Sequence, residues 1–179
     1  MFVINPKSRG IGNSQVLPRD YTNQREIEIV LSEMTGQVAS RTRKAHKKAT
    51  VVSIHIDYSR VEMKKSLNAQ VKIEPANRES IMIDHVLNLF RSKYTSGAVR
   101  RIGVSYSGFV DENYTLFSLF DNYETIEKEE KLQKAIDSVR EKFGFLAIQK
   151  GTVHTDGSRN IERSKLIGGH SAGGLEGLK

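Results

Sequence analysis

The residues best suited to chemistry are basic ones that lead directly into an alternating strand. Five Lys or Arg residues fall within residues 41–48, and the segment VVSIHIDYS follows at 51–59. Apolar and polar side chains alternate in that segment, which is the pattern of a strand buried on one side. The apolar set is Val52, Ile54, Ile56 and Tyr58, and the polar set is Ser53, His55 and Asp57. The pattern predicts a sheet face that is polar, positively charged and open to an acidic partner.

Other kinds of chemistry lack the residues that they need. The chain has no cysteine, which excludes thiol nucleophiles, disulfides and Cys-based zinc sites. Asp20, Asp57 and Asp111 lie far apart in the sequence and form no paired-acid motif, so we predict no catalytic residue. The five histidines share no ligand spacing, so we predict no metal site. The tract GGHSAGG at 168–174 lacks the GK[ST] ending of a phosphate loop.

The positive charge belongs to the first part of the chain. Residues 1–110 contain 18 Lys/Arg and 9 Asp/Glu, a net charge of +9, whereas residues 111–179 contain 10 and 12, a net charge of −2. Nucleic acid is the partner that this distribution favours, because neutralising phosphates releases counterions. A solvated surface kept soluble by its charge is the alternative. No apolar run approaches the roughly 18 residues of a membrane span, and no secretory signal is present, so we expect a cytoplasmic protein without membrane contact.

Helical and strand periods predict the element order β-α-β-β-α-β. The predicted strands are 14–17, 50–58, 69–74 and 99–109, and the predicted helices are 25–45 and 79–94. Pro18 and Pro75 are expected to end the first and third strands, because proline cannot donate a ladder hydrogen bond. Each helix carries one apolar stripe and each strand one apolar face. The expected α+β fold has two helices on one face of a four-stranded, largely antiparallel sheet.

The outer segments have patterns of their own. Residues 1–13 contain Pro6, Gly10 and Gly12 and are predicted to be a linker. Residues 124–143 predict a charged amphipathic helix that contacts a neighbour or pairs with another chain. Residues 151–179 are rich in Gly, Ser and charge, and are expected to be a flexible tail unless a partner orders them. The sequence leaves the oligomeric state open.

The uncovered sheet face is the candidate binding site. The predicted contacts are hydroxyl, imidazole and basic side chains: Ser14, Arg43, Lys47, Lys48, Ser53, His55, Lys64, Lys65, Lys72, Arg100, Arg101 and Ser105. Arg100 and Arg101 are neighbours on one strand, so they should point to opposite sides. They predict a phosphate grip, with an ordinary solvated strand start as the alternative. The face lacks an aromatic ladder, which favours contact with a duplex backbone over base stacking.

Three segments resemble a known family. KSRGIGNSQVLPRDY at 7–21, VVSIHIDYS at 51–59 and above all VRRIGVSYSGF at 99–109 are similar to the C-terminal little-finger domain of Y-family translesion DNA polymerases, of the UmuC-like ImpB/MucB/SamB type. The resemblance covers about residues 7–122. It implies that residues 14–110 bind primer–template DNA without sequence preference, in an SOS-type response to damage. An unrelated basic α+β module that binds RNA or protein is the alternative.

The same resemblance bears on enzyme activity and on a second partner. It implies that the Mg²⁺-binding carboxylates belong to an N-terminal palm, reached through the linker 1–13, so we expect this chain to hold no cofactor and to be no enzyme alone. It also implies that a peptide within 111–123 binds the sliding clamp. That peptide comprises Leu116, Phe117, Ser118, Leu119 and Phe120. Its first two residues depart from the family's QLSLF pattern, and packing back onto the sheet edge is the alternative.

Overall fold

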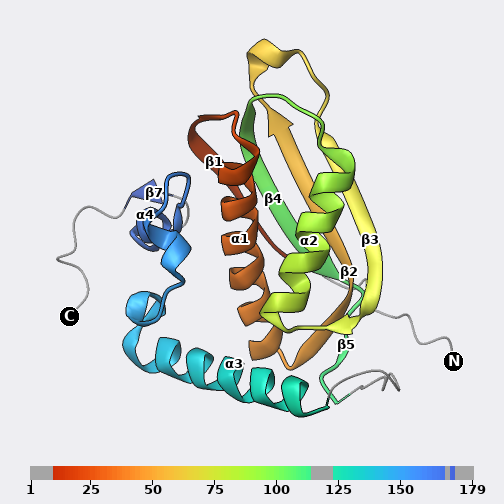
Figure 1. Ribbon diagram of the computed structural model, residues 1–179, viewed down its shortest axis with the longest axis vertical. Coiled ribbons are helices and arrows are strands. Elements are labelled where there is room, and N and C mark those ends of the chain that lie inside the picture. The colour runs from red at the N-terminus through yellow and green to blue at the C-terminus, as the bar shows by residue number, and fades with distance from the viewer. Residues whose placement is uncertain (1–9, 114–122, 168–169, 172–179) are drawn as a thin grey trace, which may run out of the picture.

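The computed structural model describes residues 10–113, 123–167 and 170–171. Its main strands are β1 (Ile11–Tyr21), β2 (Lys47–Tyr58), β3 (Leu67–Ala76) and β4 (Val99–Ser107), with a short β5 (Val110–Asp111). Its long helices are α1 (Gln24–Lys44), α2 (Glu79–Lys93) and α3 (Tyr123–Phe143). The strands lie in the order β1-β4-β2-β3 with all pairs antiparallel, and β5 pairs with the start of β2. Helices α1 and α2 cover one face of this sheet, which confirms the predicted α+β fold (Figure 1).

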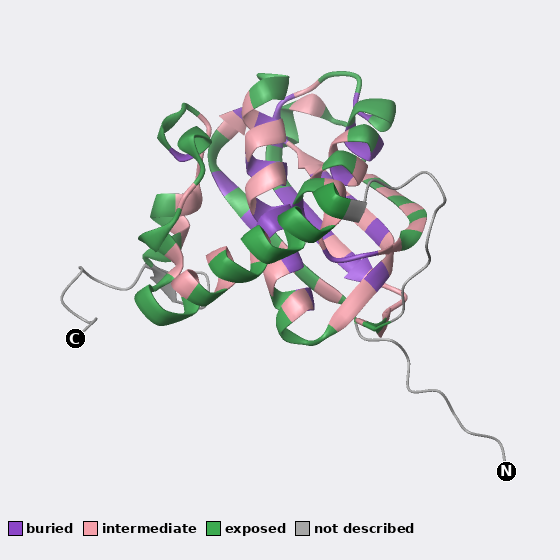
Figure 2. Ribbon diagram, turned by 60° about the horizontal axis from the view of Figure 1, so that its bottom comes forward, coloured by how far each residue is buried: buried purple, intermediate pink, exposed green. Residues whose placement is uncertain are grey.

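The core lies between the two helices and the inner face of the sheet (Figure 2). The predicted apolar stripe of α1 is fully buried there: Ile27, Val30, Leu31, Met34 and Val38. Opposite it lie the inward side chains of β2 and β4: Val52, Ile54, Ile56, Ile102, Val104 and Tyr106. Asn23 begins α1 by accepting a hydrogen bond from the backbone N–H of Arg25 at 2.9 Å. Position 36 of this helix suits a glycine, because a Cβ there would come 3.0 Å from the carboxyl group of Glu79.

Both prolines lie inside strands, so the predicted strand ends were wrong. β1 continues through Pro18 to Tyr21, and β3 continues through Pro75 to Ala76. Each is an edge strand, and its register is irregular near the proline. A missing N–H costs nothing on the outer side of an edge strand or at a bulge. The predicted linker boundary was also wrong, because residues 11–13 are part of β1.

The C-terminal arm, residues 123–167, packs against the domain through charged groups. Arg43 donates to both carboxylate oxygens of Asp137, at 2.6 and 2.9 Å, and the Arg43 side chain is only 10% exposed. Arg78 forms a second ion pair, with Glu129 at 2.9 Å. The predicted apolar stripe of α3 contributes only in part, because Ile136 and Val139 are half-buried while Leu132 and Phe143 are 62% and 67% exposed.

Beyond α3 the arm runs back along α1, so the prediction of a flexible tail was wrong for residues 151–167. These residues contain the short helix α4 (Asn160–Ser164) and β6 (Leu166–Ile167), which pairs with β7 (His170–Ser171). The carboxylate of Glu33 accepts hydrogen bonds from the Ser158 hydroxyl and from the backbone N–H of Arg159. Burial raises the pKa of Glu33. Arg163 reaches Asn13 of β1 at 3.0 Å.

Replacing Arg43 with alanine is expected to release the arm. The change leaves Asp137 unpaired in a mostly buried position, which costs about 3–5 kcal/mol when the charge cannot move. Because α3 can swing into water, we expect loss of arm packing in place of unfolding. Limited proteolysis should cut Arg43→Ala within residues 123–165 much faster than the unmodified chain. Arg78→Ala is the control, because its more exposed pair contributes about 0–1 kcal/mol, and equal cleavage of both variants would contradict the assignment.

Candidate nucleic-acid interface

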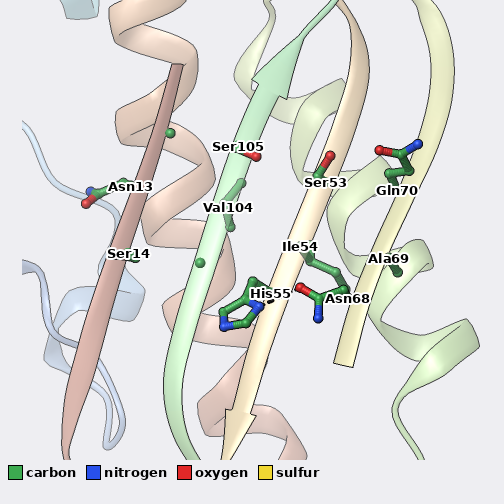
Figure 3. A pocket seen from close by; sticks show the side chains of 12 residues that line it. Asn13, Ser14, Ser53, Ile54, His55, Asn68, Ala69, Gln70, Val104 and Ser105 are labelled. Carbon is green, nitrogen blue, oxygen red and sulfur yellow. Dashed lines mark hydrogen bonds between the residues drawn. The ribbon is translucent and has the colours of Figure 1, made fainter. Parts of the chain in front are cut away.

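The sheet face opposite the helices is uncovered in the described part of the chain, and we term it the bare face. It contains a shallow concavity of about 580 Å³. Two rows of paired residues cross its floor (Figure 3). In strand order β1, β4, β2 and β3, the first row is Gly12, Ser105, Ser53 and Gln70, and the second is Ser14, Gly103, His55 and Asn68. The floor therefore presents hydroxyl, amide and imidazole groups, without a charged side chain from Lys, Arg, Asp or Glu.

Two glycines keep this floor flat. A Cβ on Gly12 would lie 2.9 Å from the Cβ of Ser105, its partner across the β1–β4 pair. A Cβ on Gly103 would lie 3.4 Å from that of His55 on β2. Without these side chains, a ligand can approach the strand backbones closely.

Asp57 organises one end of the floor. Its carboxylate accepts a hydrogen bond from the Ser66 hydroxyl at 2.5 Å and lies 3.0 Å from Nε2 of His55. The other ring nitrogen of His55 lies 2.6 Å from Oδ1 of Asn68. The Ser66 hydrogen bond is the largest of several effects that lower the pKa of Asp57, and Arg101, at 3.8 Å, contributes as well. Asp57 is therefore ionised at neutral pH and holds its basic neighbours in place.

Three cationic side chains lie at the edge of the polar floor. Arg101 and Lys72 are exposed on β4 and β3 in the same alternation as the floor residues. Arg100 is the extra residue of a bulge, because Tyr58 pairs with Val99 and Asp57 pairs with Arg101. Its guanidinium lies 3.7 Å from Asp20. The site thus combines neutral hydrogen-bonding groups at the centre with positive charge at the rim.

A comparison with protein families identifies the domain. Residues 8–119 match the impB/mucB/samB family C-terminal domain, which is more than half of the chain. The chain belongs to this family. The finding confirms the resemblance drawn from the segments at 7–21, 51–59 and 99–109.

Curated relatives of this impB/mucB/samB domain include two DNA polymerases. DNA polymerase IV 2 of Halalkalibacterium halodurans is 29% identical over 165 residues, which are 92% of this chain and 40% of that protein. DNA polymerase IV 2 of Bacillus subtilis is 31% identical over 164 residues, which are 90% of this chain and 39% of that protein. The chain therefore spans about two fifths of the length of these relatives.

A solved structure matches the impB/mucB/samB domain at a lower sequence identity than these relatives do. It is a chain of the complex of beta-clamp processivity factor and little finger domain of PolIV. The match has a TM-score of 0.46 and 10% sequence identity, and it covers 63% of this chain and 100% of that one.

Seven of the predicted contact residues lie on or beside the bare face of the impB/mucB/samB domain. They are Ser14, Ser53, His55, Lys72, Arg100, Arg101 and Ser105. Lys64 and Lys65 lie at the end of the β2–β3 hairpin. Lys65 is exposed, whereas Lys64 donates to the backbone oxygen of Ser96 at 2.8 Å and lies over the Tyr58 ring.

Three basic residues predicted for the face lie elsewhere. Arg43 lies on the helix side, where it holds the arm, so its prediction was wrong. Lys47 and Lys48 lie where β2 leaves the main sheet and pairs with β5, away from the floor, and Lys47 pairs with Asp111 at 2.5 Å. The basic run therefore divides between two layers, because it spans the end of α1 and the start of β2.

Three residues of the interface lie outside the strands that the sequence predicted. Asn68 lies just outside the predicted strand 69–74, although the alternation of β3 extends back to it and puts it on the same face as Gln70. Ser66 immediately precedes β3, and no pattern in the sequence indicates its hydrogen bond to Asp57. Gly12 was assigned to the linker. Its pairing with Ser105 becomes visible only once β1 is known to start at Ile11.

Three further predictions concern metals, membrane contact and the clamp peptide. Within the described ranges, no cluster of three or more His, Asp or Glu side chains could hold a metal ion. No helix in those ranges is long and apolar enough to span a membrane. The predicted clamp-binding residues Leu116 to Phe120 lie outside the described residues, so their role stays a prediction.

Proposed function

We propose that the bare face binds primer–template DNA through its sugar–phosphate backbone and without sequence preference. The observation that carries the proposal is the uncovered sheet face, which has a flat polar floor and a cationic rim. The rim residues Arg101 and Lys72 would neutralise phosphates. Hydroxyls such as those of Ser53 and Ser105 would donate hydrogen bonds to phosphate oxygens, a kind of contact that positions a duplex but does not distinguish its sequence.

The proposal extends to the role of the whole protein. Because the relatives are DNA polymerases and this chain spans about two fifths of their length, we infer that nucleotide transfer and its Mg²⁺ ions belong to a palm outside this chain. The domain would keep an error-prone polymerase on DNA during translesion synthesis, as part of a cytoplasmic SOS-type damage response. A domain that grips the backbone alone suits this task, since a lesion alters the bases.

Fluorescence anisotropy with the full chain tests this function. We expect equal affinity for primer–template duplexes of unrelated sequence, and a steep loss of affinity as salt rises. The same titrations with a structured RNA test the alternative module. Tighter binding to the RNA, or no binding to any duplex, would overturn the proposal.

Replacing Asp57 with asparagine is expected to raise the affinity for duplex DNA severalfold. The change removes a negative charge from a face that must approach phosphates, and it frees Arg101. It also costs stability, because the lowered pKa of Asp57 stabilises the fold at pH values above the ordinary range of an aspartate. That contribution is lost as the pH falls through the folded-state pKa. Duplex titrations at pH 7 measure the affinity. Weaker binding by Asp57→Asn would contradict the proposal that the bare face contacts the phosphates.

We also propose that residues 116–120 bind the sliding clamp. Ser118, Leu119 and Phe120 match the family pattern, and two adjacent large apolar side chains suit a pocket on a partner. Replacing Leu119 and Phe120 with alanine should abolish co-elution with a bacterial sliding clamp on size exclusion. Affinity for duplex DNA should stay unchanged in the same variant. Intact co-elution would indicate that these side chains pack within the protein.

A further inference from the structure

The hairpin between β2 and β3 ends in an exposed apolar tip, residues 60–65. The tip projects beyond the end of the sheet, at the top of Figure 1. Val61 is 82% exposed and Met63 is 95% exposed, the two highest values among the large hydrophobic residues of the described chain. Single exposed apolar residues are common on protein surfaces. Here two of them lie within three residues at the end of one projecting turn.

The tip is held in one conformation by the α2–β4 loop. The carboxylate of Glu62 accepts a hydrogen bond from the backbone N–H of Ala98 at 2.7 Å. Lys64 donates to the backbone oxygen of Ser96 at 2.8 Å, and the backbone N–H of Ser59 donates to the oxygen of Ala98 at 2.7 Å. Two polar side chains of the tip thus bond inward, while the apolar side chains point into solvent.

Met63 adopts a backbone conformation that its side chain disfavours. Its φ is 50°, in the left-handed region that glycine and asparagine populate readily and bulky residues seldom do. The inward hydrogen bonds of Glu62 and Lys64 hold this conformation, whereas the Met63 side chain, at 95% exposure, makes almost no contact with the described part of the chain. Backbone strain of this kind gathers at sites that bind ligands.

The charge around the tip indicates what it contacts. Arg60 and Lys65 flank the apolar pair, and neither has an ionic partner among the described residues. Arg100 and Arg101 lie at the same end of the sheet, because Val99 pairs with Tyr58 at the base of the hairpin. A partner with two anionic borders and an apolar interior fits this arrangement. A groove of duplex DNA has that form, with phosphates on both sides and sugar and base edges between them.

We propose that the hairpin tip enters a groove of the duplex held by the bare face. Val61 and Met63 contact the groove interior, and Arg60 and Lys65 contact phosphates on its two sides. The inference rests on the proposed DNA-binding function and adds to it an apolar anchor at the end of the face. The rigid turn lets the tip bind without first becoming ordered.

The test compares apolar and charged substitutions at the tip in the full chain. Val61→Ser with Met63→Ser should weaken duplex binding by about threefold to tenfold, the equivalent of losing part of the burial of two side chains. The dependence of affinity on salt should not change, because no counterion is involved. Arg60→Ser with Lys65→Ser should reduce the slope of log K against log salt by about 2. Leu132→Ser, on the distant helix α3, is the matched control and should bind as the unmodified chain does.

Other outcomes separate the two proposals. If the unmodified chain binds duplex and the tip variant binds as Leu132→Ser does, the tip inference is wrong and the bare-face function stands. If the unmodified chain binds no duplex, the function itself is wrong. Met63→Gly removes the side chain and relaxes the left-handed backbone, so it should fold at least as well and still bind more weakly. If Met63→Gly and Val61→Ser, tested as single variants, both bound duplex as tightly as the unmodified chain, the inference would be overturned.

Discussion

Charge reversal at Arg100 and Arg101 is expected to weaken binding to primer–template DNA by about 10- to 100-fold near 0.15 M salt. Both residues lie at the end of β4 on the rim of the bare face. Losing two phosphate contacts should also lower the slope of log K against log salt by about 2. The loss should be the same on every sequence, because contacts to phosphates carry no sequence information. Anisotropy titrations at several salt concentrations measure both quantities.

Two further variants make this result interpretable. Arg25→Glu reverses one charge, half of the change in the double variant, at the start of α1 in the layer on the other side of the sheet, and should change the affinity by far less than half as much. Replacing Arg100 and Arg101 with glutamine removes their charges without adding repulsion from Asp20 and Asp57, and should give an intermediate loss. If Arg25→Glu weakened binding as much as the double reversal, the effect would come from net charge and the bare face would not be the interface.

Replacing Tyr106 with alanine is expected to lower the free energy of unfolding by about 3–5 kcal/mol. Tyr106 is fully buried between the sheet and α1, and its hydroxyl donates to the backbone oxygen of Thr35 at 3.1 Å. Burial raises the pKa of this hydroxyl far above its usual range, so it stays protonated and remains a donor. Tyr106→Phe keeps the ring and loses the hydrogen bond, at a cost of about 1 kcal/mol. Urea denaturation of the three proteins measures these differences.

Ser105→Ala is the matched control for Tyr106. It lies next to Tyr106 on β4, but its side chain faces the concavity of the bare face. Removing a half-exposed hydroxyl should change the stability by less than about 0.5 kcal/mol. Equal losses at 105 and 106 would mean that β4 does not bury one face only, and the proposed interface would lose its geometric basis.

The contrast between Ser105 and Tyr106 also marks what could be predicted from the sequence. Alternation along β2 and β4 determines which side chains face the helices, because adjacent strand residues point in opposite directions. The same local rule, with the stripes of α1 and α2, predicts the half-covered sheet and its polar floor. The half-buried floor residues Ser53, His55 and Ser105 were found in this way.

Residues whose partners are distant in sequence could not be placed by local rules. Arg43 belongs to a basic run, yet its position depends on Asp137, which lies 94 residues further along the chain. The tail has the composition of a flexible segment, yet it packs on α1 because Glu33 accepts hydrogen bonds from Ser158 and Arg159. Neither pairing leaves a periodic signal, since each needs a single complementary group.

The element types, the apolar and polar faces, the family and the basic character of the face could all be predicted before any contact was known. Those properties follow from side-chain periods and composition, which act over a few residues. Three features emerge only from the folded chain: which cations reach the face, how both edge strands accommodate a proline, and how the arm and the hairpin tip are held. These features depend on contacts between segments that only the folded chain brings together.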